Sequence, residues 1–582
     1  MPISLVKADS LLAIDVGSVH TRVSLFDVVE ARYRFLGSGI SPNTLNYPFN
    51  DIQEGIHQAI EQLQSVTGRQ ILSPDAQLIT PEQSDGSGVD LIAATISAYP
   101  PVKVIVAGLL EDLSVESAAK LAGTIASIIL HRFSLNDHLT TEARLNAIVQ
   151  SKPDLILVAG GTEQGAQNSV WKILETIGLA RNLLAEEHQP HIVYLGNTQL
   201  HEKIKNNPYL GEKVYLGVNI HPTLEEEQFQ PAIKTFMKAF HDIQQKQIPG
   251  YSTLLEWSKG SLLPASLGWE RIIRLLDKVY DPKKGVLGVD IGSSTLNLVA
   301  SFSGETKVSA FPQFGLTSPT PSILETINID EIKKWLIYDF TEPEIKNLIL
   351  TRQLYPGSIP MTEKELDFEY ALSTVLLQNS LRLFLKQLSK DYHGDYLPAM
   401  EPIIASGAVL TNAHNLARSG LVLLNGLQPI HITTLVLDQH HLIKTLGAAG
   451  ALNSLLAIQA MDYGTLLNLA SVIAPVGYAK PGTVILKVKI VEEDGQEQKL
   501  DVRFGQLISL PLPIGKTMQL QLQPLHKFDV GMGGGGIGGR VRLNGSVLGV
   551  IIDARGRPIC LPKDAERRRE AHQRWLNILE KR

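Results

Sequence analysis

Cysteine is almost absent from this chain of 582 residues, which contains only Cys560. A single cysteine excludes an internal disulfide, a thiolate zinc site and an iron–sulfur cluster held by one chain. Long apolar runs are also missing, since the most apolar stretch, residues 466–476, is interrupted by Asn468, Ser471 and Pro475. The first residues lack the basic start and apolar run of a signal peptide. We therefore expect a cytoplasmic protein without a transmembrane segment.

An excess of positive charge is missing as well. The chain has 53 Lys and Arg against 59 Asp and Glu, a net charge of −6 and a pI of about 6.3. Without an overall basic field, we expect no nucleic-acid partner. A hydrophobic fraction of 44% with 19% charged residues is ordinary for a globular protein. The length is too great for one core, and at roughly 150 residues per domain it predicts three or four domains.

Short apolar runs that end in glycine recur between residues 100 and 220, and helix-length segments separate them. Runs with two apolar faces are typical of strands in a buried, mostly parallel sheet, and their alternation with helices predicts an α/β fold. The runs are residues 102–108, 154–160, 191–196 and 213–217, and helices are expected at residues 51–66, 114–130 and 166–184.

The character of the sequence changes after residue 474. Further helices are expected before that point, whereas short strands separated by turns follow it. The pattern predicts a small β-rich domain over residues 474–560, with a glycine-rich loop at residues 531–539, and a basic helical tail over residues 561–582. The helices before the change are expected at residues 224–279 (interrupted near Pro249 and Pro264), 363–388 and 442–458, and the strands after it at residues 484–490, 499–504, 507–512, 518–522 and 541–552.

Two segments of the chain repeat the same pattern. Residues 12–18 read Leu-Ala-Ile-Asp-Val-Gly-Ser and residues 287–293 read Leu-Gly-Val-Asp-Ile-Gly-Ser, each followed by a second apolar run. A second pair, residues 158–162 and 404–408, places a glycine turn after an apolar strand in each half. Internal duplication of this kind predicts two related halves, which we place at residues 1–280 and 281–473.

The residue types in the repeat suit phosphate binding. A hairpin turn with glycine lets backbone N–H groups approach phosphate oxygens, and Ser or Thr adds hydroxyl donors. An Asp beside the phosphates is better suited to hold Mg²⁺ through water or to orient an attacking water. Two such hairpins facing each other would surround a triphosphate, and a glycine turn at a strand end would leave room for adenosine.

These residues resemble the duplicated ribonuclease H-like ATPase core shared by actin, heat-shock chaperones and sugar kinases. More narrowly, the layout resembles the glutamate mutase L family. The residues that carry the resemblance are the first hairpin at Asp15-Val16-Gly17-Ser18, the run at residues 153–163 and the second hairpin at residues 290–295. The resemblance covers the chain from about residue 10 to about residue 460, and leaves out the predicted β-rich domain and tail.

The resemblance implies a role for each motif. The phosphate-1 loop maps to the hairpin at residues 12–25, the phosphate-2 loop to the hairpin at residues 287–299, and the adenosine turn to residues 403–412. The implied binding residues are Asp15, Gly17, Ser18 and Thr21 in the first loop, Asp290, Gly292, Ser293, Ser294 and Thr295 in the second, and Ser406, Gly407 and Ala408 in the turn. Asp15 and Asp290 would be the catalytic carboxylates and would hold Mg²⁺ through water.

Two positions depart from the superfamily pattern. The second loop usually has a glycine pair after its Asp, where this chain has Gly292-Ser293, and the adenosine turn has Ser406 where a glycine is usual. Both changes keep a small residue, so we expect binding to survive and hydrolysis to be slow or absent. Two interpretations are open for Gly160, Gly161 and Thr162. They line the nucleotide cleft, or they form a strand-to-helix turn with Thr162 near the helix N-cap.

The resemblance implies a switch protein that binds ATP or ADP with Mg²⁺ and is expected to hydrolyse ATP. It further implies an accessory or reactivating protein whose client is an adenosylcobalamin-dependent mutase. One alternative is an actin-like protomer that assembles into nucleotide-dependent filaments. A second is a small-molecule kinase, which would need a catalytic Asp in a substrate-domain loop that the sequence does not identify.

The glycine-rich loop is expected to be flexible and to reach a partner or another subunit. The basic tail is read as a solvated helix, with binding to an acidic partner surface or to lipid headgroups as the alternatives.

Overall fold

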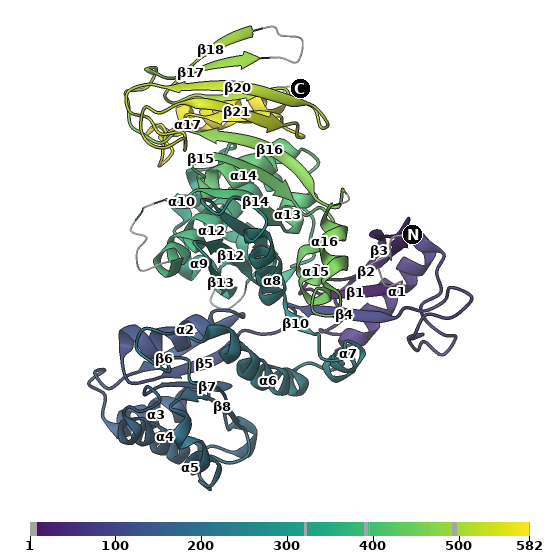
Figure 1. Cartoon of the computed structure of the whole chain (residues 1–582), viewed down its shortest axis with the longest axis vertical. Coiled ribbons are helices and arrows are strands. Elements are labelled where there is room, and N and C mark those ends of the chain that lie inside the picture. The colour runs from purple at the N-terminus through teal and green to yellow at the C-terminus, as the bar shows by residue number, and fades with distance from the viewer. Residues whose placement is uncertain are drawn as a thin grey trace, which may run out of the picture.

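The computed structural model describes residues 9–318, 323–388, 394, 396–462, 464–491 and 497–580; the ends of the predicted first half and tail, residues 1–8 and 581–582, lie outside them. The described chain forms four sheets with helices around and between them (Figure 1). No helix among these residues is long and apolar enough to cross a membrane.

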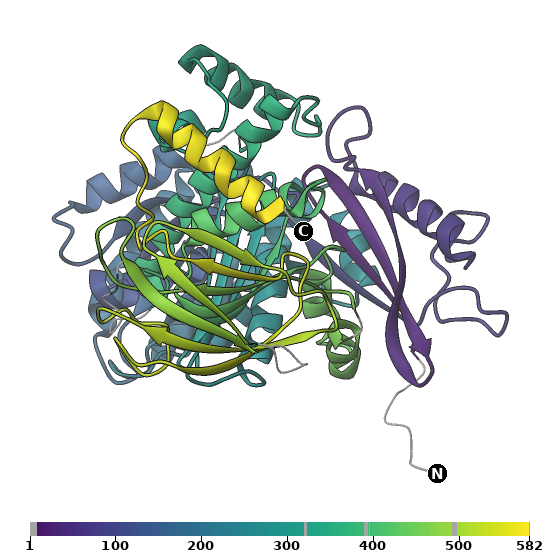
Figure 2. The same ribbon diagram turned by 90° about the horizontal axis from the view of Figure 1, so that it is seen from above.

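The first predicted half contains a five-stranded sheet in the order β10-β4-β1-β2-β3. The strands β1, β2 and β3 run antiparallel in succession, while β4 runs parallel to β1 and β10 parallel to β4. Helix α1 covers one face, and this unit stands to one side of the molecule when seen from above (Figure 2). The bounds are β1 Leu11–Val16, β2 His20–Val29, β3 Arg32–Pro42, α1 Ile52–Thr67, β4 Leu91–Ile96 and β10 Leu263–Pro264.

The second predicted half repeats this topology. Its sheet begins in the order β13-β12-β11-β14-β15, with the first three strands antiparallel and β14 and β15 parallel to β11. Two sheets with the same order and directions confirm the duplicated ribonuclease H-like core. The bounds are β11 Gly285–Ile291, β12 Leu296–Phe302, β13 Glu305–Phe311, β14 Met400–Ser406 and β15 His431–Leu437.

Two helices join the halves, because each of them packs on the sheet of the other half. Helix α8, Ala265–Asp277, precedes the second half but packs on β11, β12 and β13. Helix α15, Ile443–Ala449, follows β15 but packs on β1 and β4 of the first half. Trp269, Ile443 and Leu446 are buried in the core between the sheets. Apolar burial therefore holds the two halves together through an exchanged pair of helices.

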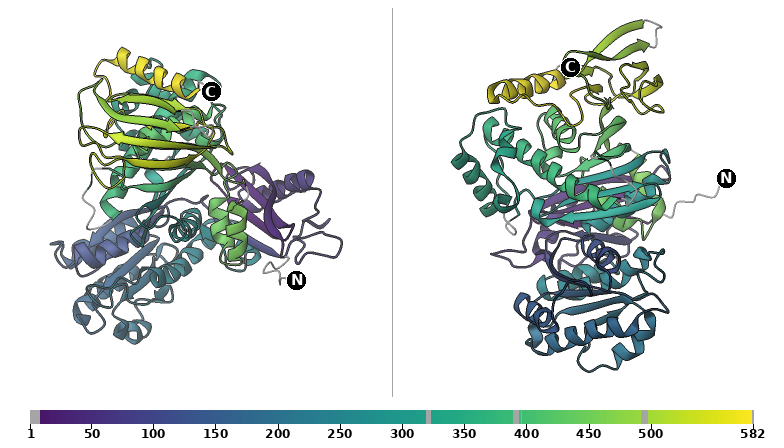
Figure 3. Two further views of the ribbon diagram at one scale, coloured as in Figure 1. Left: turned by 45° about the horizontal axis from the view of Figure 1, so that its top comes forward. Right: turned by 90° about the vertical axis from the view of Figure 1, so that its left-hand side faces the viewer.

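A separate parallel sheet is inserted between β4 and β10, in the order β6-β5-β7-β8-β9. It lies at the opposite end of the molecule from the C-terminal strands (Figures 1 and 3). Strands β5, β7, β8 and β9 end at or directly before the glycines predicted from the sequence, whereas β6 does not. The bounds are β5 Val102–Ala107, α2 Glu116–Ala122, β6 Ser127–Phe133, α3 Thr141–Ser151, β7 Leu155–Gly160, α4 Gln167–Asn182, β8 His191–Gly196, α5 His201–Lys205, β9 Val214–Leu216, α6 Phe229–Gln247 and α7 Tyr251–Trp257.

The helix expected at residues 114–130 was wrong over its second part. A π-helical turn at Glu111–Val115 leads into α2, which ends at Ala122, and residues 127–133 form β6 instead. Gly123 follows the helix, and the β-branched residues Ile128 and Ile129 then favour a strand. Pairing of β6 with β5 stabilises that choice.

The C-terminal strands are continuous with the second half. Strand β16 pairs antiparallel with β15, and β22 and β19 extend the same sheet across residue 474, where we predicted a domain boundary. A second sheet, β18-β17-β20-β21, packs on this extension over a shared apolar core. The bounds are β16 Leu467–Ala474, β17 Val484–Val491, β18 Glu497–Arg503, β19 Leu507–Leu510, β20 Thr517–Pro524, β21 Gly539–Asn544 and β22 Val550–Asp553.

The tail forms one helix, α17, Ala565–Glu580, which contacts α14 and β19. His572 and Trp575 are buried on its inner face. The remaining helices surround the second half, except for α16, which packs on β3 of the first half. They are α9 Ile323–Thr326, α10 Ile329–Lys333, α11 Glu342–Leu354, α12 Glu363–Leu388, α13 Ala408–Thr411, α14 Leu416–Leu427 and α16 Ser454–Asp462.

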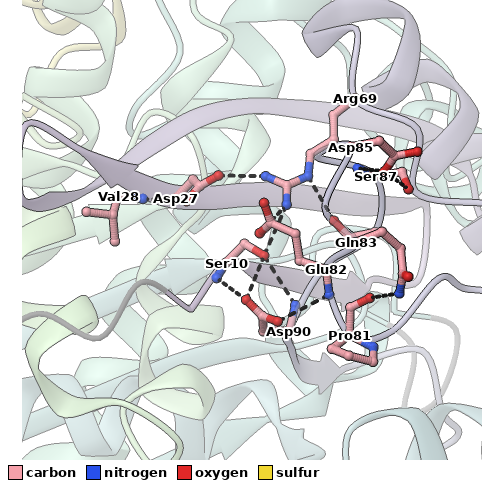
Figure 4. Close-up of polar contacts among 11 residues, drawn as sticks. Ser10, Asp27, Val28, Arg69, Pro81, Glu82, Gln83, Asp85, Ser87 and Asp90 are labelled. Atoms are coloured by element: carbon pink, nitrogen blue, oxygen red, sulfur yellow. Dashed lines mark hydrogen bonds and ion pairs between the residues drawn. The ribbon is translucent and has the colours of Figure 1, made fainter.

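Arg69 fixes the long connection between α1 and β4 (Figure 4). Its Nη1 lies 2.6 Å from Asp27 Oδ2 and its Nη2 lies 2.5 Å from Glu82 Oε2. Its Nε donates to the Gly88 carbonyl over 2.8 Å, and its side chain is only 11% exposed. The guanidinium of Arg69 thus links Asp27 of β2 to Glu82 and Gly88 in the connection.

Candidate functional site

The two predicted hairpins have the same turn. Gly17 N donates to the His20 carbonyl over 3.0 Å, and Gly292 N donates to the Thr295 carbonyl over 3.1 Å. A Cβ on Gly17 would lie 2.8 Å from the His20 oxygen, and one on Gly292 would lie 2.6 Å from the Thr295 oxygen. Each turn therefore requires glycine, for the same steric reason, and the repeat seen in the sequence is a repeat in geometry.

Each turn is also held in the same way by the chain that follows the third strand. Asn43, just after β3, donates from Nδ2 to the Gly17 carbonyl over 2.6 Å. Thr317, after β13, donates from its backbone N to the Ser293 carbonyl over 2.9 Å, and its Oγ1 lies 2.5 Å from Ser293 Oγ. These contacts fix both tips before any ligand arrives.

The hydroxyls of the two loops differ in exposure. Ser18, Ser293 and Ser294 are half-buried, so a ligand can reach them. Thr21 is fully buried, and its Oγ1 has no hydrogen-bond partner among the residues that the structure describes. Ser294 Oγ donates to the carbonyl of Ser97, just after β4, over 3.4 Å. The second hairpin therefore contacts the first half directly. Thr295 is buried at the base of its turn.

The two Asp side chains occupy equivalent positions in their sheets. Asp15 lies opposite Arg22 across the first hairpin, and Asp290 lies opposite Asn297 across the second. Thr95 Oγ1 donates to Asp15 Oδ1 over 3.0 Å, and Asn297 Nδ2 donates to Asp290 Oδ2 over 3.3 Å. Both carboxylates are buried, at 3% and 6% exposure. Buried carboxylates of this kind need nearby positive charge or donors.

Lys444 supplies that charge, and sequence reasoning missed it. This residue belongs to α15, and its Nζ lies 2.7 Å from Asp15 Oδ2 with 12% of the side chain exposed. Burial lowers the pKa of Lys444, but the carboxylates of Asp15 and Asp290 raise it above its ordinary value overall, so the ammonium stays charged. The only signal in the sequence was a lone lysine in an apolar, small-residue helix.

Further charges surround the pair. Burial raises the pKa of Asp290; the charge of Lys444 opposes this effect and that of Asp15 adds to it. Burial lowers the pKa of Arg22, and the carboxylates of Asp15, Asp438 and Asp290 raise it in part. The bases of the two hairpins thus form one electrostatic cluster that spans the two halves.

The predicted adenosine turn lies beside the second hairpin. Gly407 is buried with φ +119°, and a Cβ there would lie 2.3 Å from the carbonyl oxygen of Ile291, the last residue of β11. Glycine is therefore required where the turn meets the strand that carries Asp290. Ser406 ends β14 and is buried, while Ala408 begins α13 and is exposed.

His441 and Asp438 support this turn and were not among the predicted site residues. The His441 ring lies between Ser406, with Nδ1 3.1 Å from Oγ, and Thr411, with Nε2 3.0 Å from Oγ1. Burial lowers the pKa of His441 well below its usual range, so the ring is neutral. The Asp438 carboxylate accepts the N–H groups of the residues that begin α15, and burial raises its pKa to about 6.

Gly160, Gly161 and Thr162 lie elsewhere, at the end of β7 in the inserted sheet. Asn219 Nδ2 donates to the Gly161 carbonyl over 2.8 Å, and Asn197 Nδ2 donates to the Thr162 carbonyl over 2.9 Å. Within the described ranges, the hydrogen bonds of these three residues connect them to the inserted sheet and its loops and not to either hairpin. Their part in nucleotide binding stays a prediction.

Comparison with protein families decides the relationship of the chain. A family model described as MutL protein matches residues 11–463, which include both hairpins, the inserted sheet and the adenosine turn. The chain belongs to the MutL protein family. The match ends just before β16, so the C-terminal strands and α17 lie outside it. A comparison with curated proteins found no match.

Solved structures similar to this MutL family member are distant. A nucleotide-free acetone carboxylase has 12% identity and a TM-score of 0.29, covering 86% of this chain and 82% of that one. A nucleotide-free diol dehydratase-reactivating factor has 9% identity and a TM-score of 0.29, covering 78% and 100%. An ethanolamine utilization protein from Carboxydothermus hydrogenoformans has 9% identity and a TM-score of 0.25, covering 76% and 90%. With scores this low, these likenesses carry no functional conclusion.

Proposed function

We propose that this MutL family member is an ATP-binding switch protein whose cleft lies between the two glycine hairpins. The observation that carries the proposal is the shared turn geometry of Gly17 and Gly292, each at the tip of a hairpin on one of two duplicated sheets. Glycine turns of this kind present backbone N–H groups to phosphate oxygens without steric hindrance from a side chain.

The residues around the turns have distinct roles in this proposal. The half-buried hydroxyls of Ser18, Ser293 and Ser294 bind phosphate oxygens together with the backbone of the turns. Thr21 Oγ1, a buried donor without a partner in the described part of the chain, is a further phosphate or water ligand. The buried glycine turn at Gly407 leaves room for adenosine beside the second hairpin.

The switch itself lies in the exchanged helices. Because α8 and α15 each pack on the sheet of the opposite half, a ligand that binds both hairpins changes the relative position of the halves through these two helices. A more specific part of the proposal is that the protein hydrolyses ATP. It assigns Asp290, whose pKa is raised by burial, and Asp15 to arrange the attacking water.

The client is proposed from the family alone. The glutamate mutase L resemblance implies an adenosylcobalamin-dependent mutase that is reactivated when the switch changes state. Such a partner would contact surfaces outside the cleft, and the C-terminal strands are available for this because they lie at the end of the molecule away from the inserted sheet (Figure 3).

Titration calorimetry with ATP and with ADP tests nucleotide binding. We expect micromolar affinity for the unaltered protein, and a loss of about tenfold or more in a Ser18→Ala, Ser293→Ala, Ser294→Ala variant that removes only the phosphate-facing hydroxyls. Gly292→Ala should lose binding too, because its Cβ meets the Thr295 carbonyl. Gly123→Ala is the matched control, since its Cβ would meet nothing closer than 3.5 Å.

Electron microscopy of the same samples separates a switch from a filament. Discrete particles with ATP and with ADP are expected for a switch, whereas nucleotide-dependent filaments would favour the protomer alternative. If the unaltered protein binds neither nucleotide, the proposed function is wrong.

A further inference from the structure

The bases of the two hairpins hold a cation of their own, the ammonium of Lys444. We propose that Lys444 supplies the positive charge that a divalent ion held by Asp15 would otherwise provide, so that the nucleotide phosphates bind without Mg²⁺. This inference rests on the proposed function and makes it more specific. It conflicts with the sequence-based prediction that Asp15 holds Mg²⁺ through water.

Both carboxylate oxygens of Asp15 already have partners, which compete with a metal or its water shell. Its Oδ2 lies 2.7 Å from Lys444 Nζ, its Oδ1 accepts from Thr95 Oγ1 over 3.0 Å, and its side chain is 4% exposed. A hydrated Mg²⁺ needs carboxylate oxygens that can accept from its waters, and it keeps several waters around it. A dication placed beside this carboxylate would also repel the ammonium that is already there. The donor set at Asp15 therefore does not fit Mg²⁺.

The packing of α15 against α8 holds Lys444 in this position. A Cβ on Gly268 of α8 would lie 2.2 Å from the Lys444 carbonyl oxygen, so the two helices are in main-chain contact at this residue. Helix α15 cannot shift toward α8 to release the ammonium, and on its other side it packs on β1 and β4. The positive charge is thus a fixed part of the cleft.

The cluster already pairs carboxylates with cations before any ion is added. The carboxylates of Asp15 and Asp290 face the cations of Lys444 and Arg22. The third carboxylate, Asp438, accepts from two backbone N–H groups, 2.8 and 2.9 Å away. His441 is neutral because burial lowers its pKa well below the usual range. Carboxylates that are already paired attract a dication less strongly, whereas the two cations can attract the oxygens of an anionic phosphate chain.

Calorimetry with ATP in excess EDTA and in excess Mg²⁺ tests the inference. We expect the affinity of the unaltered protein to differ by less than about threefold between the two conditions. Lys444→Met should lose about 10- to 100-fold in EDTA, because a charge-assisted hydrogen-bond donor to phosphate is removed, and should regain part of this in Mg²⁺, since Asp15 is then free. Lys444→Arg should retain binding in EDTA.

Lys284→Met is the matched control. Lys284 is also partly buried and paired, with Glu401, but it lies just before β11 at the end of the strand opposite to Asp290. Its loss should leave the EDTA affinity unchanged. A drop of about 30-fold or more for the unaltered protein in EDTA would overturn the inference while leaving the proposed function intact. Absence of ATP binding under both conditions would overturn the two together.

Mn²⁺ binding to the nucleotide-free protein gives a second readout that does not depend on ATP. In the unaltered protein, electron paramagnetic resonance of added Mn²⁺ should detect no Mn²⁺ site at Asp15. The Asp15→Asn variant should therefore bind Mn²⁺ to the same extent. In Lys444→Met such a site should appear, and a Lys444→Met, Asp15→Asn variant should lose it again. A stoichiometric Mn²⁺ site in the unaltered protein that Asp15→Asn abolishes would contradict the inference, even if Lys444→Met failed to fold.

Discussion

Gly268 of α8 and Gly447 of α15 cross with their main chains in contact. A methyl group on Gly447 would lie 1.9 Å from the Gly268 carbonyl oxygen. Each of the two helices packs on the sheet of the opposite half, so this crossing is the point at which the halves are joined most closely. It also fixes the register of α15, and with it the position of Lys444 opposite Asp15.

Gly447→Ala should therefore lower the free energy of unfolding. The added methyl forces the helices apart, and overpacking of this kind costs about 1–3 kcal/mol. Urea denaturation followed by circular dichroism measures the change. Gly450→Ala is the control: it lies in the same helix region, and its Cβ would come no closer than 3.3 Å to another atom, so its effect should be small. Equal stability of the two variants would mean that the helices do not cross at Gly447.

Loss of Lys444 should destabilise the fold as well as alter ligand binding. Lys444→Met leaves the buried Asp15 carboxylate without its partner, and breaking a buried pair from one side costs about 3–5 kcal/mol. A Lys444→Met, Asp15→Asn variant removes both charges and should recover much of this loss. Chemical denaturation of the two single variants and the double variant forms a complete cycle. Additive effects would show that the two side chains do not interact.

Arg69 offers a test of stability remote from the cleft. Arg69→Met leaves the carboxylates of Asp27 and Glu82 without their cation and removes the bond to Gly88, so we expect a loss of about 3 kcal/mol. Proteolysis should then cut the connection between α1 and β4 more readily. Arg132→Met is the control, because Arg132 and its partner Glu111 are each more than 40% exposed and such pairs contribute less than about 1 kcal/mol. Resistance of the Arg69→Met protein to cleavage would contradict this role.

The docking of α17 should weaken in acid. His572 Nε2 lies 2.8 Å from the Lys334 carbonyl oxygen, and burial lowers the pKa of His572 to about 4. An unfolded His protonates near pH 6.5, so the unfolded state binds more protons between about pH 6.5 and pH 4, and stability falls as the pH falls through that window. Between pH 7 and pH 5 the contribution lost is about 2 kcal/mol.

His572→Gln removes this titration and keeps a polar group. The difference in unfolding free energy between the unaltered protein and this variant should shrink on going from pH 7 to pH 5. Comparing the two proteins cancels the contributions of the other buried histidines, among them His191 and His241, whose pKa values burial also lowers to about 4. Parallel pH profiles for the two proteins would exclude His572 as the titrating group.

The hairpins could be predicted because their information is local. The strand, Asp, glycine and return strand lie within about fifteen consecutive residues, and glycine is required by a contact with a carbonyl only three residues away. The same holds for the turn at Gly407 and for the parallel strands that end in glycine. The local signal misled the prediction at residues 114–130, where small and apolar residues suit a helix but pairing with β5 makes residues 127–133 a strand.

Other features depend on residues distant in the sequence. Strands β22 and β19 extend the sheet of the second half by pairing between strands that are up to about 80 residues apart. No local pattern in the sequence indicates this extension. Likewise, the residue types at positions 160–162 are those of a nucleotide turn, but these residues lie in a different sheet from the two hairpins.

The sequence alone determined the family, the duplicated α/β core and the two glycine hairpins, because each rests on short motifs whose spacing limits the backbone. Only the tertiary structure decided that Lys444 lies against Asp15, that Gly268 meets Gly447, and that Gly160 lies in a different sheet from the hairpins. The physical reason is distance along the chain: the partners in the first two contacts are 429 and 179 residues apart. Contacts of that range are set by the packing of whole helices and sheets, which no window of sequence contains.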